Sequence, residues 1–89
     1  MKGGGMVIVD NAEESRFEAY ENDELAGFLD YRKVGEKTVL VHTESLVEGR
    51  GIGSALAKHA LETLDDVVVV CPFIKKYLER HPEYRVTVQ

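Results

Sequence analysis

Hydrophobic and polar residues alternate along the first half of the chain, as they do in half-buried β-strands. The alternation predicts four strands, and two of their connections carry turn chemistry, Asn22-Asp23 and Gly35-Glu36. Two-residue turns join antiparallel neighbours, so the sequence predicts an antiparallel meander. The four predicted strands are Met6–Val9, Ser15–Tyr20, Leu25–Val34 and Lys37–Leu46.

The fourth strand carries candidate chemistry on one of its faces. Strict alternation gives two sets of side chains, Val39, Val41 and Thr43 against Leu40, His42 and Glu44. His42 and Glu44 therefore share a face, and either is a candidate general base. An imidazole is the better base near neutral pH. The alternative is a strand histidine that only hydrogen-bonds to a neighbour.

The period changes to that of a helix after the fourth strand. Between Gly51 and Leu64 apolar residues recur every four positions, which predicts a helix with one buried face. Val67–Val70 is apolar on both faces, as in a buried parallel strand. Strand, helix and strand form one βαβ unit, for which a right-handed crossover is expected.

A second helix is predicted to begin at Cys71-Pro72, because proline suits the first helical position, and to end at His81-Pro82. Tyr84–Val88 is predicted as a last edge strand. The expected fold class is therefore α/β in the broad sense (α+β). An antiparallel meander runs into one right-handed βαβ unit, giving a mixed sheet with two helices.

Length and composition restrict the number of domains and the class of protein. Eighty-nine residues predict one domain, residues 6–89, after a flexible leader over residues 1–5. A single cysteine excludes an internal disulfide, and the longest apolar run, Val67–Cys71, is too short to span a membrane. No basic leader precedes an apolar segment. We therefore expect a cytoplasmic protein that does not bind membranes.

The net charge of −5 argues against nucleic acid as a partner, because binding a phosphate backbone usually needs a basic face. An acidic surface mildly favours a cationic partner. The alternative is a charge that only keeps the protein in solution. The sequence does not choose between a monomer and a weak homodimer.

Three glycines, Gly49, Gly51 and Gly53, stand directly before the first helix. Glycine lets the backbone approach a ligand, and free N–H groups at a helix start favour an anion. The stretch therefore predicts a phosphate or pyrophosphate site. It is neither a Walker motif, because Ser54-Ala55 follows the last glycine, nor a dinucleotide fingerprint, because the glycines are two residues apart. The alternative is a tight turn that binds nothing.

The order of these features resembles the Gcn5-related N-acetyltransferase (GNAT) superfamily, in its very small single-domain branch. The resemblance spans roughly residues 7–85. The matching stretches are His42-Thr43-Glu44, Arg50-Gly51-Ile52-Gly53, Cys71-Pro72-Phe73, Lys76-Tyr77-Leu78 and Arg80-His81-Pro82-Glu83-Tyr84.

The resemblance implies acetyl-CoA as the ligand. Its pyrophosphate is expected on the backbone N–H groups of the loop formed by Arg50, Gly51, Ile52, Gly53 and Ser54. Glu48 stands where the superfamily has Gln or Arg. The pantetheine arm is expected along the end of the central strand, at Thr43, Ser45, Leu46 and Val47. Only residues 10–14 separate the first two strands, so the acceptor side is expected to be open or completed by a partner.

The resemblance also implies that Tyr77 protonates the departing CoA thiolate, whereas its spacing alone equally fits core packing. Cys71 lies at a helix start, which stabilises a thiolate, so it is a candidate to accept the acetyl group. The alternative is a small buried residue that ends a strand. No pair of histidines or cysteines has metal-ligand spacing, so no metal is expected.

The expected function is acetyl transfer from acetyl-CoA to a primary amine of unknown identity. The base is His42 or Glu44, the acid is Tyr77, and a backbone N–H near Leu46 or Val47 stabilises the oxyanion. Two alternatives stay open. One is a minimal CoA-binding module without efficient turnover, and the other is a structural domain whose loop binds nothing.

Overall fold

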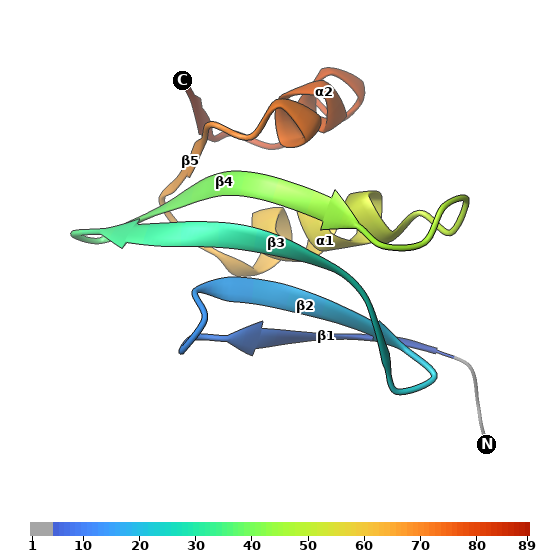
Figure 1. Ribbon diagram of the computed structural model, residues 1–89. Coiled ribbons are helices and arrows are strands. Elements are labelled where there is room, and N and C mark those ends of the chain that lie inside the picture. Colours follow the sequence, from blue (N-terminus) through green and yellow to red (C-terminus); the bar gives the residue numbers. More distant parts are fainter. Residues whose placement is uncertain (1–4) are drawn as a thin grey trace.

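The computed structural model describes residues 5–89, so most of the expected leader, residues 1–4, lies outside the described part. Within residues 5–89, six strands form one mixed sheet in the order β1-β2-β3-β4-β5-β6, and two helices accompany it (Figure 1). The elements are β1 (Met6–Asn11), β2 (Arg16–Glu21), β3 (Glu24–Val34), β4 (Lys37–Ser45), α1 (Ile52–Thr63), β5 (Val67–Val69), α2 (Pro72–Arg80) and β6 (Thr87–Val88). The predicted fold class is confirmed.

The antiparallel meander comprises β1 to β4, each paired with the next. Asn22 and Asp23 both have left-handed backbone angles, with φ of 51° and 66°, as the tight turn between β2 and β3 requires. Gly35, with φ of 63°, turns the chain between β3 and β4. Local turn chemistry thus starts these two hairpins, and a register shift in each of them changes the pairing beyond the turn.

The parallel half begins where Thr38–Leu40 of β4 pairs with Val67–Val69 of β5, and α1 is the crossover between them. β6 also pairs parallel with β5, so α2 is a second crossover. The sequence predicted this last strand without its direction. The structure therefore adds a second, shorter βαβ unit to the expected one.

The core lies on one face of the sheet, between the strands and α1. Figure 1 shows α1 behind the sheet and no helix in front of β2 and β3. The buried stripe of α1 meets apolar side chains from β2, β3 and β4, and α2 adds one fully buried residue, Ile74. Members of this cluster include Phe17, Ala19, Leu29, Leu40, Leu56, Ala57 and Ala60. Neither helix has the length and apolarity of a membrane span within the described residues.

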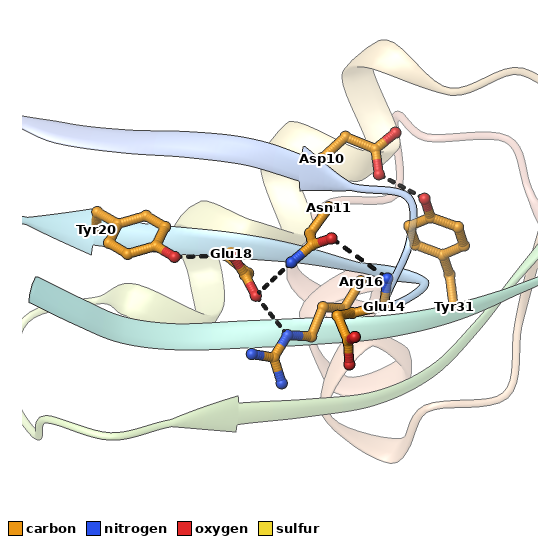
Figure 2. Close-up of polar contacts among 7 residues, drawn as sticks. All are labelled: Asp10, Asn11, Glu14, Arg16, Glu18, Tyr20 and Tyr31. Atoms are coloured by element: carbon orange, nitrogen blue, oxygen red, sulfur yellow. Dashed lines mark hydrogen bonds and ion pairs between the residues drawn. The ribbon is translucent and has the colours of Figure 1, made fainter.

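The helix-free face buries a carboxylate, Glu18, which is 4% exposed. Figure 2 shows three donors that converge on it: Arg16 Nε at 2.6 Å, Tyr20 Oη at 2.8 Å and Asn11 Nδ2 at 3.1 Å. The Arg16 guanidinium also lies 4.7 Å from the centre of the Phe28 ring. Chiefly the hydrogen bond from Arg16, and next that from Tyr20, lowers the pKa of Glu18. Paired polar side chains thus cover part of a face that no helix covers.

We expect Glu18→Gln to destabilise the protein at pH 7 and to make its stability less sensitive to acid. A carboxyl whose pKa is lower in the folded state stabilises it above the unfolded-state pKa of about 4.5, and this contribution is lost as pH falls through the folded-state value. Urea unfolding at pH 7 and pH 3 measures the free energy of unfolding of the variant and of the wild-type chain. Glu36→Gln, in an exposed turn, is the control. If Glu18→Gln lowered the free energy of unfolding equally at both pH values, the stabilising role of the Glu18 charge would be contradicted.

Gly27 fixes the distance between β3 and the start of α1. A Cβ atom there would lie 2.6 Å from the Glu44 carbonyl oxygen and 2.6 Å from Ile52 Cγ2. We expect Gly27→Ala to lower the free energy of unfolding by about 1–3 kcal/mol, because backbone must move to accept the methyl group. Gly5→Ala, which meets nothing within 4 Å, should be neutral in the same denaturation experiment.

Candidate active site

The parallel strands β4 and β5 separate after Leu40. β5 ends at Val69, whereas β4 continues to Ser45. The Leu40 carbonyl accepts hydrogen bonds from both the Val70 and the Cys71 N–H, each at 3.0 Å, as the chain turns into α2. Within residues 5–89, no strand pairs with this side of β4 beyond Leu40. An extended ligand can hydrogen-bond to such an open strand edge.

A β-bulge at Val41 changes which side chains of β4 share a face. The register shifts between Asp30 and Tyr31, and Val41 has no Cα partner on β3. Thr43 is opposite Leu29 of the core, whereas His42 is opposite Asp30. The predicted strict alternation is therefore wrong: Leu40 lies on the core face with Thr43, because the extra residue reverses the alternation beyond it.

Thr43 and Cys71 meet where the strands separate. The Thr43 Oγ1 atom is 3.3 Å from Cys71 Sγ, and Cys71 is 1% exposed. Cys71 is the N-cap residue of α2, and its carbonyl accepts the Lys75 N–H at 3.0 Å. The thiol is thus buried, as the structural alternative predicted, and it also adjoins the open edge of β4. Its role as an acetyl acceptor stays a prediction.

A first hollow, of about 320 Å³, lies beside the glycine loop and reaches Thr43 and Ser45. Gly49 and Gly51 have φ of 74° and 68°, values that favour glycine. Gly51 is the N-cap of α1, and no side chain caps this helix end. The first N–H groups of a helix have no acceptor within it, so this end favours an anion.

Gly53 has a different role from the other two glycines. A Cβ atom on Gly53 would lie 2.7 Å from Phe73 Cζ, so the missing side chain lets the Phe73 ring rest on the first turn of α1. Phe73 is 42% exposed and lines the first hollow. The sequence pattern does not reveal this contact, because it depends on two helices packing together.

Leu46 and Arg50 each make a contact within the protein that involves a group predicted to bind the ligand. The Leu46 N–H donates to the Ala26 carbonyl at 2.8 Å, so it is not free to stabilise an oxyanion, and that part of the prediction is wrong. Arg50 Nη2 lies 3.3 Å from Glu21 Oε2, so its side chain turns toward the end of β2. Glu48 lines the first hollow together with Val47.

A second hollow, of about 550 Å³, lies between α1 and α2, and Ser54 and Phe73 line both hollows. The Tyr77 ring faces this second hollow and stacks on His81, with ring centres 4.1 Å apart. Burial raises the pKa of the Tyr77 phenol, and a hydrogen bond with Tyr84 opposes the rise.

Tyr77 lines the second hollow together with Ser54, Phe73 and His81, whereas Thr43 lines the first. The Tyr84 hydroxyl donates to Glu62 Oε2 at 2.7 Å, near the C-terminal end of α1. Thr43 lines the first hollow, near the N-terminal end of that helix. The structure brings Tyr77 together with His81 and Tyr84, and its predicted role as an acid stays untested.

His42 and Glu44 form an exposed pair on the helix-free face, with His42 Nε2 2.9 Å from Glu44 Oε1. Their Cα partners on β3 are Asp30 and Phe28. The candidate bases thus lie on the opposite face of β4 from Thr43. The contact between Thr43 and Cys71 and the pair of His42 and Glu44 therefore lie on opposite sides of the sheet.

Among residues 5–89, no group of three or more His, Cys, Asp or Glu side chains is arranged to hold a metal ion. The expectation that the protein uses no metal stays a prediction.

Comparison with known proteins adds one match. A sequence model of a family described as GCN5-related N-acetyl-transferase matches residues 16–87. The matched stretch runs from the start of β2 to the start of β6 and contains the glycine loop, Cys71 and Tyr77. No curated protein matches the chain.

Proposed function

The chain belongs to the GCN5-related N-acetyltransferase family, and on that premise we propose that it transfers the acetyl group of acetyl-CoA to a primary amine. The family generally uses acetyl-CoA, and the resemblance predicted from the sequence is confirmed. The observation that supports the proposal most directly is the open edge of β4 beyond Leu40, which begins beside Cys71 and leads to the glycine loop.

The cofactor would run along β4 from the glycine loop toward the strand separation. Its pyrophosphate would accept hydrogen bonds from the N–H groups of Ile52, Gly53 and Ser54 at the start of α1. The amides of its pantetheine arm would pair with the backbone of Thr43–Ser45 at the end of β4. The thioester would then lie near Thr43 and Cys71, whose side chains are 3.3 Å apart.

The acceptor amine would approach from the helix-free face. His42, oriented by Glu44 at 2.9 Å, would take a proton from the ammonium group directly or through water. The neutral amine would attack the thioester carbonyl, and N–H groups on the same edge of β4 would stabilise the oxyanion. Collapse of the tetrahedral intermediate would form the amide and expel CoA as a thiolate, which needs a proton. An acidic chain suits a cationic acceptor.

A CoA-binding module with little turnover is the second candidate. The connection between β1 and β2 contains only residues 12–15, and no helix covers that face of the sheet within the described residues. An open acceptor side favours binding of the cofactor without efficient positioning of an amine.

We expect acetyl-CoA to bind with a dissociation constant between about 1 μM and 1 mM, the range in which KM values of enzymes usually fall. Isothermal titration calorimetry measures this constant. Release of CoA thiol with a panel of amines, including polyamines and lysine peptides, then measures transfer. Binding without thiol release for any amine would favour the module. No binding at millimolar acetyl-CoA would overturn both functions.

We expect Cys71 rather than Tyr77 to deliver the proton to the CoA thiolate, because only Cys71 adjoins Thr43 at the strand separation. Cys71→Ala should lower kcat at least about tenfold with little change in KM for acetyl-CoA. Tyr77→Phe keeps the stacked ring and should retain kcat within about threefold.

The opposite ranking of the two variants would assign the acid to Tyr77, as the family pattern implies. Intact-protein mass spectrometry after incubation with acetyl-CoA tests whether Cys71 also accepts the acetyl group covalently. A gain of one acetyl group that Cys71→Ala abolishes would indicate a covalent step. Thermal unfolding of both variants checks that the loss of a buried thiol has not unfolded the protein.

A further inference from the structure

The two outer strands of the sheet differ in length. Within residues 5–89, β1 (Met6–Asn11) ends the sheet on one side and β6 (Thr87–Val88) ends it on the other. Figure 1 shows β1 at the lower border of the sheet, on the side away from α2. An outer strand has unpaired N–H and C=O groups along its free edge, so a short strand offers few of them and a long strand offers many. β1 is therefore the outer strand better suited to pair with another chain.

β1 lacks the features that usually protect an outer strand from pairing. Its sequence, Met-Val-Ile-Val-Asp-Asn, contains neither lysine nor proline, and its register with β2 is continuous, without a bulge. Its one charged residue, Asp10, accepts a hydrogen bond from the hydroxyl of Tyr31, a core residue (Figure 2). Natural sheets use charges, proline and bulges to keep their edges from pairing. β1 instead has a regular and largely apolar edge.

Two exposed valines extend this apolar edge onto the helix-free face. Val7 and Val9 are 57% and 42% exposed, and their Cα partners on β2 are Tyr20 and Glu18. On the other face of the sheet, α1 packs chiefly on β2, β3 and β4 rather than on β1. A strand added beside β1 would therefore meet backbone hydrogen-bonding groups at the edge and apolar side chains on the helix-free face.

The sequence of β1 is complementary to itself in the antiparallel direction. In two copies related by a two-fold axis through Ile8, each Ile8 lies opposite its equivalent, Val7 lies opposite Val9 of the second copy, and Met6 lies opposite Asp10. This register pairs valine with valine twice and sets no like charges opposite each other. A register centred on Asp10 would instead bring the two Asp10 carboxylates together. Self-pairing about Ile8 is thus the arrangement that the strand favours.

We infer that two copies of this chain associate through β1, which pairs antiparallel with its equivalent about Ile8 and joins the two sheets into one. A contact of one strand from each copy is smaller than the roughly 1,200–2,000 Å² of a standard protein interface, so the dimer is weak and depends on concentration. Because β2 and β3 separate β1 from β4, the pairing leaves the open edge of β4 and the glycine loop free. The inference therefore does not rest on acetyl transfer.

Sedimentation equilibrium on the full chain measures the association. We expect the weight-average mass to rise from that of one chain toward that of two between about 10 μM and 1 mM, as for a weak dimer. Val7→Lys/Val9→Lys should stay monomeric, because the register sets lysine against lysine. The matched control, Val34→Lys/Val88→Lys, alters valines that are 54% and 52% exposed and should associate as the wild-type chain does.

Disulfide cross-linking tests the register. Val7→Cys and Val9→Cys chains, mixed in a glutathione redox buffer, should form a cross-linked dimer faster than either variant alone. Residues 7 and 9 face each other across the two copies, at a separation that a disulfide can span. The native thiol of Cys71 is 1% exposed and does not compete.

The outcomes separate this inference from the proposed function. A mass that stays that of one chain up to about 1 mM would overturn the dimer. Association that persists in Val7→Lys/Val9→Lys would place the contact elsewhere and also overturn it. Urea unfolding checks that this variant is folded, and if it is not, cross-linking decides. Cross-linking of Val7→Cys alone as fast as the mixture would overturn the register about Ile8. Acetyl-CoA binding, measured by calorimetry, should be the same in the monomeric variant as in the wild-type chain.

Discussion

The separation of β4 from β5 after Leu40 is the feature on which the rest of the structure depends. Pairing of the two strands stops because the Leu40 carbonyl accepts two successive N–H groups while the chain turns into α2. The turn places Cys71 against Thr43 and leaves the remainder of β4 with an open edge. The same edge ends in the glycine loop, so an open strand and an uncapped helix start lie in one continuous groove.

A β-bulge at Val41 divides the candidate chemistry between the two faces of the sheet. The extra residue puts Thr43 on the core face and leaves His42 and Glu44 on the helix-free face. Polar groups occupy part of the sheet face that no helix covers, beside exposed apolar side chains such as Val7 and Val9. Glu18, with three donors around it, keeps part of this face closed, whereas the pair of His42 and Glu44 stays accessible.

The three loop glycines act for two physical reasons. Gly49 and Gly51 adopt left-handed backbone angles with open space around them, whereas Gly53 lacks a side chain so that Phe73 can rest on α1. Phe73 in turn connects the two hollows, one beside the open edge of β4 and one among the cations of the helices. A chain with a net charge of −5 thus concentrates positive charge beside the groove that ends at its glycine loop.

The sequence alone determined the elements, their order and the family, because alternation, helical period and turn residues act locally. The residues Asn22-Asp23 favour a tight turn through their own backbone preferences, and Pro72 favours the first position of a helix. It also located the glycine loop and Cys71. Only the tertiary structure decided that Leu40 and Thr43 share a face and that Leu46 donates its N–H to Ala26. It also decided that Tyr77 stacks on His81 and that Lys58 lines the same hollow as Arg80. Each of these contacts depends on a bulge or on packing between segments distant in the chain, and no local pattern encodes either.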